Sequence, residues 1–223
     1  MILPPEVPVE YAEVLKQYRE IVRIIETDFE KAYYEDTIPV PNGAENYDWF
    51  AMLIDGARWS GKLGYVVQDI NTDGIPELFW VGEDHDLLAI FTISNGKAIN
   101  VGAFRPKYWA IVTEDNEIQA YATCGADSGV DYIMFLPAKS DRLQIKNMIY
   151  QDSYYDKDGR PVSAYYKYTW SGELMQPNYV ETWEDRVNKV AITEEEYLAF
   201  REQYPLRWEA TESWKQNKIH FIN

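Results

Sequence analysis

The chain has 223 residues, 46% of them hydrophobic, which is enough to build a globular core without disulfides or structural zinc. Its 21 basic and 37 acidic residues give a net charge of -16 at pH 7, so neither nucleic acid nor an anionic membrane is expected as a partner. The single cysteine, Cys124, excludes an intrachain disulfide and a CxxC zinc site, and two histidines, His85 and His220, leave little material for a His-based site.

No stretch of the sequence is apolar over the length of a membrane span. The first five residues lack the charged and apolar regions of a signal peptide, which leaves two interpretations open: a cytoplasmic protein, or a chain from which a leader has been removed. Nothing has the composition of an interdomain linker, so residues 1–223 are expected to form a single domain. The oligomeric state stays open.

A long helix is expected over about residues 9–34. Hydrophobic residues recur there at alternating steps of four and three, which places them on one helical face. These residues are Tyr11, Leu15, Tyr18, Val22, Ile25 and Phe29. The helix should end before Pro39, and the stripe predicts that it faces the core. A second, short helix is predicted over residues 47–54.

From residue 63 onwards the hydrophobic period shortens towards two, which is typical of strands. Turn signals such as Asn95-Gly96 and Asp158-Gly159 separate these segments and predict hairpins. The predicted strands cover residues 63–70, 77–81, 87–94, 97–104, 108–113, 117–123, 131–136, 143–150, 153–155 and 164–170.

A late helix is expected over about residues 193–204. Thr193 and Glu196 match a capping box, and Pro205 ends the helix. One long helix, hairpin-linked strands over about residues 63–190 and a late helix are typical of an α+β fold. We therefore expect the N-terminal helix to pack on a many-stranded antiparallel sheet.

Residues 69–77 carry the spacing of a calcium-binding loop. Oxygen donors occupy positions 1, 3 and 5, and Gly74 at position 6 allows a sharp turn. A backbone carbonyl follows at position 7 and a carboxylate at position 9. The predicted metal ligands are Asp69, Asn71, Asp73, Ile75 and Glu77. Hard oxygen donors of this kind suit Ca²⁺.

Two features separate this loop from an EF-hand. Trp80 stands at position 12, where an EF-hand has a bidentate glutamate, and the flanking segments are predicted strands. An EF-hand switch is therefore not expected. The alternative to a metal site is a metal-free loop in which Asp and Asn side chains bond to backbone N–H groups.

The residues around this loop resemble a segment of known bacterial domains. Tyr65 precedes the loop by four residues, and Leu78 ends a Pro-Glu-Leu sequence. The pattern is similar to one in uncharacterised secreted or lipoprotein domains of gut Firmicutes, and to single calcium loops of the FG-GAP/VCBS type. The resemblance is specific over residues 65–81. It implies an extracellular or cell-surface location and calcium binding, and no particular activity.

Three weaker acidic clusters each allow two interpretations, a functional one and a purely structural one. The segment of residues 83–86, which contains His85, either adds a ligand to the loop or forms a solvated turn. Asp127 and Asp131 form either a carboxylate pair for acid–base chemistry or part of a plain loop. A third group is either a second cation loop or a hairpin turn, and it consists of Asp152, Asp156 and Asp158.

Aromatic residues make up 15% of the chain and concentrate near residues 154–155 and 165–170. Alternation along a strand places them on both faces, so one face is available as a binding platform for sugars or peptides. The simpler interpretation is cross-strand aromatic pairing, because strands favour aromatic residues.

Three functions remain open from the sequence. The leading hypothesis is a non-catalytic, calcium-stabilised module of a bacterial surface or secreted protein, with a glycan or a protein as its ligand. The second is a cation-assisted hydrolase that uses carboxylates, although the sequence contains no nucleophile elbow, P-loop or HExxH motif. The third is an acidic cytoplasmic interaction or inhibitor domain for a basic partner.

Overall fold

A computed structural model describes residues 3–34, 61–104, 108–123, 128–170, 187–205 and 209–222. The predicted N-terminal helix begins as a 3-10 turn, η1 (Val9–Tyr11), and continues as α1 (Ala12–Tyr34). The first four residues of the predicted stripe, from Tyr11 to Val22, are buried. The side chains of the other two, the predicted end of the helix near Pro39 and the predicted helix over residues 47–54 lie outside the described part.

The strands form two antiparallel sheets, where the sequence led us to expect one. Sheet A consists of β1 (Gly64–Gln68), β2 (Glu77–Val81), β3 (Leu87–Ser94), β4 (Lys97–Ala103) and β11 (His220–Phe221), in the order β11-β1-β2-β3-β4. Sheet B consists of β5 (Tyr108–Val112), β6 (Ile118–Thr123), β7 (Gly129–Phe135), β8 (Gln144–Tyr155), β9 (Pro161–Trp170) and β10 (Val187–Ile192), in the order β10-β9-β8-β7-β6-β5.

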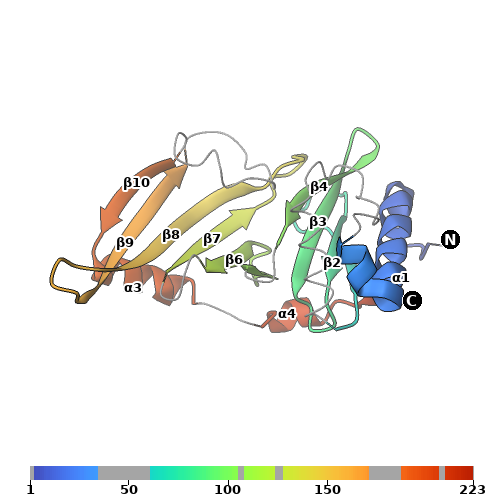
Figure 1. Ribbon diagram of the computed structural model, residues 1–223. Coiled ribbons are helices and arrows are strands. Elements are labelled where there is room, and N and C mark those ends of the chain that lie inside the picture. Colours follow the sequence, from blue (N-terminus) through green and yellow to red (C-terminus); the bar gives the residue numbers. More distant parts are fainter. Residues whose placement is uncertain are drawn as a thin grey trace.

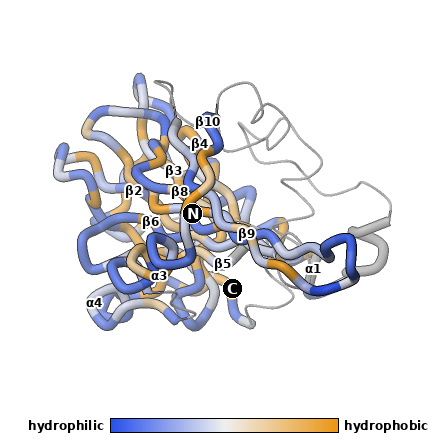
Figure 2. Tube along the Cα trace, turned by 90° about the vertical axis from the view of Figure 1, so that its left-hand side faces the viewer, coloured by the Kyte–Doolittle hydropathy of each residue, from blue (hydrophilic) through white to orange (hydrophobic). Residues whose placement is uncertain are grey.

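Sheet A is the middle layer of the molecule. Figure 1 shows α1 on one side of β2 and β3 and sheet B on the other. Leu78 and Trp80 of β2 join the core under α1, while Phe79 and Val81 join the core shared with sheet B. Because both faces are covered, β2 is buried along its whole length. Figure 2 shows orange, hydrophobic segments among the strands, while α1 carries both hydrophobic and hydrophilic segments.

Two bulges interrupt the alternation in sheet A. The register between β2 and β3 shifts at Leu88, and that between β3 and β4 shifts at Val101. The side-chain amide of Asn100 donates hydrogen bonds to the carbonyls of Ile90 and Gly102, both at 3.2 Å. The amide therefore holds the second bulge in place and satisfies carbonyl groups that the irregular ladder exposes.

The C-terminal segment returns to sheet A, which the sequence did not predict. It contains α4 (Glu212–Lys215) and then β11, which pairs with β1. Trp214 of α4 is buried, and its ring lies edge-on to Phe79 at a centroid distance of 4.8 Å. The segment therefore fills the core between the two sheets at one end.

The late helix is confirmed as α3 (Glu194–Gln203), with the predicted capping box at its start. The Thr193 hydroxyl accepts a hydrogen bond from the Glu196 N–H at 3.1 Å, and the Glu196 carboxylate accepts one from the Thr193 N–H at 2.8 Å. These bonds satisfy two N–H groups that the helix itself leaves unpaired.

Substituting Thr193→Ala should destabilise the protein by about 1 kcal/mol, because the hydroxyl acceptor is lost. This corresponds to a drop of about 2–4 °C in melting temperature for a chain of this size, measured by calorimetry. Thr193→Ser keeps the acceptor and should stay within about 1 °C of the wild type. An equal drop for the two variants would contradict a capping role for the hydroxyl.

Candidate functional site

The loop of residues 69–77 joins β1 to β2, and its polar side chains converge on backbone N–H groups. Asp69 and Asn71 both accept a hydrogen bond from the Asp73 N–H, at 3.3 and 3.1 Å. The second Asp69 oxygen accepts the Gly74 N–H at 2.8 Å, and Asp73 accepts the Ile75 N–H at 2.8 Å. Gly74 has a φ of 87°, a conformation that glycine adopts without strain. The loop geometry thus brings three oxygen-bearing side chains to its tip.

Asp73 also connects this loop to sheet B. Its second carboxylate oxygen accepts the backbone N–H of Lys139 at 2.7 Å. Lys139 lies in the connection between β7 and β8, and its φ of 60° is unusual for a residue with a side chain. The loop is therefore a point where a turn of sheet A and a turn of sheet B are joined by a charge-assisted bond.

Glu77 behaves differently from the other predicted ligands, because its side chain turns into the core. It is fully buried, and its two oxygens accept hydrogen bonds from the Ile70 N–H and the Thr92 hydroxyl, both at 3.1 Å. Burial raises the pKa of Glu77 to about 7, against the opposing effect of these two bonds, and the charges of Asp73 and Asp69 raise it further.

The N-terminal helix anchors the same loop from the other side. The Tyr11 hydroxyl donates to the carbonyl of Pro76 at 2.9 Å and lies 3.2 Å from that of Phe91. Burial raises the pKa of Tyr11 well above its usual value, with a further contribution from the Glu77 carboxylate. Tyr11 thus stays neutral and fixes the end of the loop to η1, the first turn of the N-terminal helix.

The five predicted ligands therefore divide into two groups. Asp69, Asn71 and Asp73 lie together at the tip, whereas Glu77 is engaged inside the protein. Across the described residues, no three His, Cys, Asp or Glu side chains are grouped closely enough to hold a metal ion. The donors that fit Ca²⁺ are two carboxylates, one amide oxygen and the Ile75 carbonyl, which is a partial oxygen shell that water would complete.

The cluster of residues 83–86 forms a turn that contacts other parts of the chain. The His85 ring lies 3.0 Å from the carbonyl of Asn217, and the Asn217 amide donates to the Gln68 side chain at 2.8 Å. Burial raises the pKa of Asp86, and the nearby charge of Asp84 adds to the rise. The turn thus helps to attach the C-terminal segment to β1.

Asp131, one of the two acids considered for acid–base chemistry, is held by a partner that sequence reasoning missed. Its carboxylate lies 2.9 Å from the Arg201 guanidinium of α3 and is almost fully buried. Burial raises the pKa of Asp131 to about 6, and Arg201 opposes this rise. An acid within the hydrophobic run of residues 130–135 is the signal that a partner was needed. Asp127 lies outside the described residues, as does Cys124.

The remaining acidic group forms a hairpin turn between β8 and β9. Asp156 accepts hydrogen bonds from the N–H groups of Asp158 and Arg160, at 2.8 and 2.9 Å. Asp152 instead accepts bonds from Ser128 and Tyr150, both at 3.3 Å. These acids are therefore engaged separately and do not converge on one point.

The aromatic residues of β8 and β9 pair with one another. Tyr150 lies opposite Tyr166 and stacks on it at 6.2 Å, and the Lys189 ammonium lies 3.7 Å from the Tyr166 ring centre. On the opposite face, Tyr165 contacts Tyr197 of α3 at 4.6 Å. Both faces of the strand are thus used for internal contacts. At the end of β8, Tyr155 is 76% exposed.

Comparison of the chain with protein-family models, with curated proteins and with solved structures finds no match in any of the three. Within the described residues, no helix combines the length and apolar character needed to cross a membrane.

Proposed function

We propose that this protein is a non-catalytic module of a bacterial surface or secreted protein, in which calcium bound at residues 69–77 stabilises the junction of the two sheets. The observation that carries the proposal is the position of Asp73, which belongs to the loop and also bonds to Lys139 of sheet B. An ion held by Asp69, Asn71 and Asp73 would order that junction, so its binding free energy would add to the stability of the fold.

The composition of the site places its affinity in the range of extracellular calcium modules. Two carboxylates and one amide, without a position-12 glutamate, should give a dissociation constant on the order of 0.1–1 mM. Such a site is empty at cytosolic calcium concentrations and fills outside the cell. A location at the cell surface, with a glycan or a protein as ligand, is the setting in which this module would work.

Calcium should raise the melting temperature of the wild-type chain. About 10 mM calcium would add about 1.5–3 kcal/mol at the expected affinity, which corresponds to a rise of about 3–10 °C. The measurement is a calorimetric comparison of EDTA, calcium and magnesium buffers. Magnesium should have a smaller effect, because it requires stricter geometry and keeps its water ligands.

Asn71→Asp provides a sharper test than removal of a ligand. It keeps the acceptor for the Asp73 N–H, adds a third carboxylate, and should tighten calcium binding about tenfold. In EDTA the variant should be less stable than the wild type, because three like charges then lie together. Asp73→Ala is unsuitable, because it also removes the bond to Lys139.

Asp158→Asn is the matched control, since it changes an acid on the exposed turn between β8 and β9 and should leave the calcium response unchanged. Melting temperatures that stay constant in calcium for both the wild type and Asn71→Asp would rule out the metal site. The side-chain bonds of a metal-free turn would then be the whole role of these residues.

A further inference from the structure

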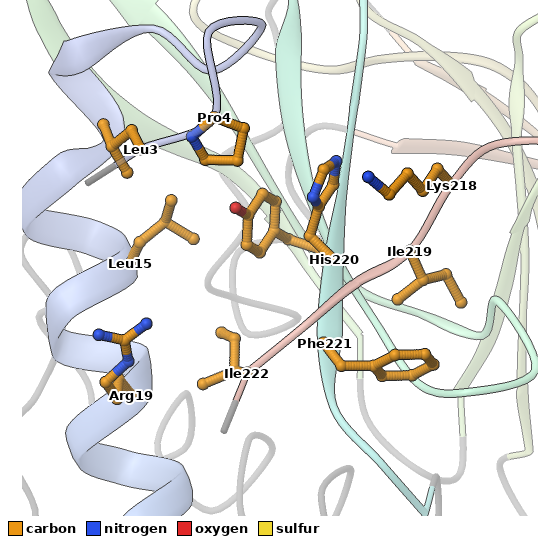
Figure 3. A pocket seen from close by; sticks show the side chains of 10 residues that line it. Leu3, Pro4, Leu15, Arg19, Lys218, Ile219, His220, Phe221 and Ile222 are labelled. Carbon is orange, nitrogen blue, oxygen red and sulfur yellow. The ribbon is translucent and has the colours of Figure 1, made fainter. Parts of the chain in front are cut away.

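A cavity of about 390 Å³ lies between α1, the N-terminal residues Leu3 and Pro4, and the C-terminal residues 218–222. Figure 3 shows Leu15 and Arg19 of α1 on one side and Lys218 and His220 of the C-terminal segment on the other. None of the residues that line it belongs to the loop of residues 69–77. The volume is at the lower end of the range for small-molecule sites.

The charged residues of this cavity are basic, although the whole chain carries a net charge of -16. Arg19, Lys218 and His220 line it, and none of the described residues that line it is acidic. Within the described residues, the side chains of Arg19 and Lys218 form no ion pair or hydrogen bond, so both cations are available to a ligand. In an acidic protein such a concentration of positive charge favours an anion at this one place.

Glu6 is an acid that contacts one of the residues lining the cavity. Its carboxylate lies 3.3 Å from the His220 ring, and half of its side chain is exposed. Burial lowers the pKa of His220, and the charge of Lys218 lowers it further against the attraction of Glu6. At neutral pH the cavity therefore presents the two permanent charges of Arg19 and Lys218, with one carboxylate at its edge.

The remaining walls are apolar or aromatic. Leu3, Leu15 and Ile222 contribute aliphatic surface, and the buried ring of Tyr65 stacks on His220 at a centroid distance of 5.0 Å. Inorganic phosphate matches the charges but makes no use of these walls. A ligand that uses both has an anionic head and a compact apolar body.

We propose that this cavity binds a small organic carboxylate, whose charge is attracted by Arg19 and Lys218 and whose apolar body lies against Leu15 and Ile222. The site is independent of the calcium loop and does not require that the proposed function hold. Arg19 and Lys218 are both exposed at the mouth of the cavity, so they select the ligand by its charge. The buried walls select the ligand by its shape.

The test is a titration of the full chain with 3-phenylpropionate in EDTA at pH 7 and low salt, followed by backbone amide NMR shifts. A ligand of this size should bind with a dissociation constant on the order of 1 mM. Shifts should concentrate at residues 15–19, 65 and 218–222. The neutral analogue 3-phenylpropionamide should bind at least about tenfold more weakly, because it lacks the charge. Inorganic phosphate should bind more weakly as well.

The double variant Arg19→Gln and Lys218→Gln should weaken binding of 3-phenylpropionate at least about tenfold. Lys16→Gln with Lys157→Gln is the matched control, since it removes two exposed charges that do not line the cavity. Equal binding of the neutral amide, tighter binding of phosphate, or equal weakening by the control pair would each overturn the proposal. So would the absence of shifts up to about 20 mM, because the expected affinity would already saturate the site.

Discussion

Replacing Arg201 with methionine should lower the free energy of unfolding by about 3 kcal/mol at pH 8 and by much less at pH 5. The reason is that Asp131, almost fully buried, would lose the guanidinium that lies 2.9 Å from its carboxylate. Arg201 is itself only about one-fifth exposed, so the cost of removing its guanidinium from water offsets part of what the pair contributes. The measurement is denaturant unfolding over this pH range.

The pH dependence follows from the pKa of Asp131. Burial raises it to about 6 in the folded chain, whereas the unfolded chain has about 3.9. Between these two values the unfolded chain releases its proton first, so stability falls as pH rises and then levels off above about 6. Without Arg201 the folded pKa rises further, so the fall continues to higher pH and the cost of the substitution grows with it.

Asp131→Asn supplies the control. It removes the titrating group, so Arg201→Met should cost about the same at pH 5 and pH 8 in that background. A cost of Arg201→Met that is independent of pH in the wild-type background would show that Arg201 acts through contacts other than its pairing with Asp131. Its contact with Tyr197, whose hydroxyl lies 3.2 Å from the guanidinium, would then carry the effect.

Glu77→Ala should destabilise the protein by about 4 kcal/mol in EDTA, where no metal contributes. The substitution leaves the Ile70 N–H and the Thr92 hydroxyl buried without their acceptor, and each unsatisfied group costs about 1–3 kcal/mol. The space left by the side chain adds to this cost. Unfolding in guanidinium chloride measures this loss of stability directly.

Glu77→Gln should cost about 1 kcal/mol or less, because the amide keeps the shape, accepts from one donor and offers its own N–H to the Thr92 hydroxyl. Glu114→Ala, on the exposed turn between β5 and β6, should stay within about 0.5 kcal/mol of the wild type. A mild effect of Glu77→Ala in EDTA, combined with a complete loss of the calcium response, would identify Glu77 as a metal ligand instead of a buried support.

The α+β class, the long helix and most strands could be predicted because they depend on local pattern. The number of sheets could not, since the hydrophobic runs of β2 and β3 indicate burial on both faces but do not show whether helices or a second sheet provide the cover. The bulge at Leu88 could not be predicted either, because it depends on packing. The extra residue in β3 shifts the side chains on one side of it to the other face of the sheet.

In the candidate loop, too, some features could be predicted from the sequence and others could not. Asp69, Asn71, Asp73 and Gly74 predict a tight turn from their side-chain chemistry alone. Glu77, however, is position 9 of the loop and also the first residue of β2. Its direction is set by the pleat of that strand, which places it opposite Thr92 of β3. The Asp131–Arg201 pair joins residues seventy positions apart, so only the tertiary arrangement reveals it.

The return of the C-terminal segment to β1 determines when the fold is completed during synthesis. Tyr65 pairs with His220, about 150 residues later in the chain. While a ribosome is still making sheet B, the outer edge of β1 therefore has no neighbouring strand, and Phe79 lacks the ring of Trp214. Contacts over such long separations form slowly, and open strand edges promote association between nascent chains. Sheet A is therefore finished last, although most of it is translated first.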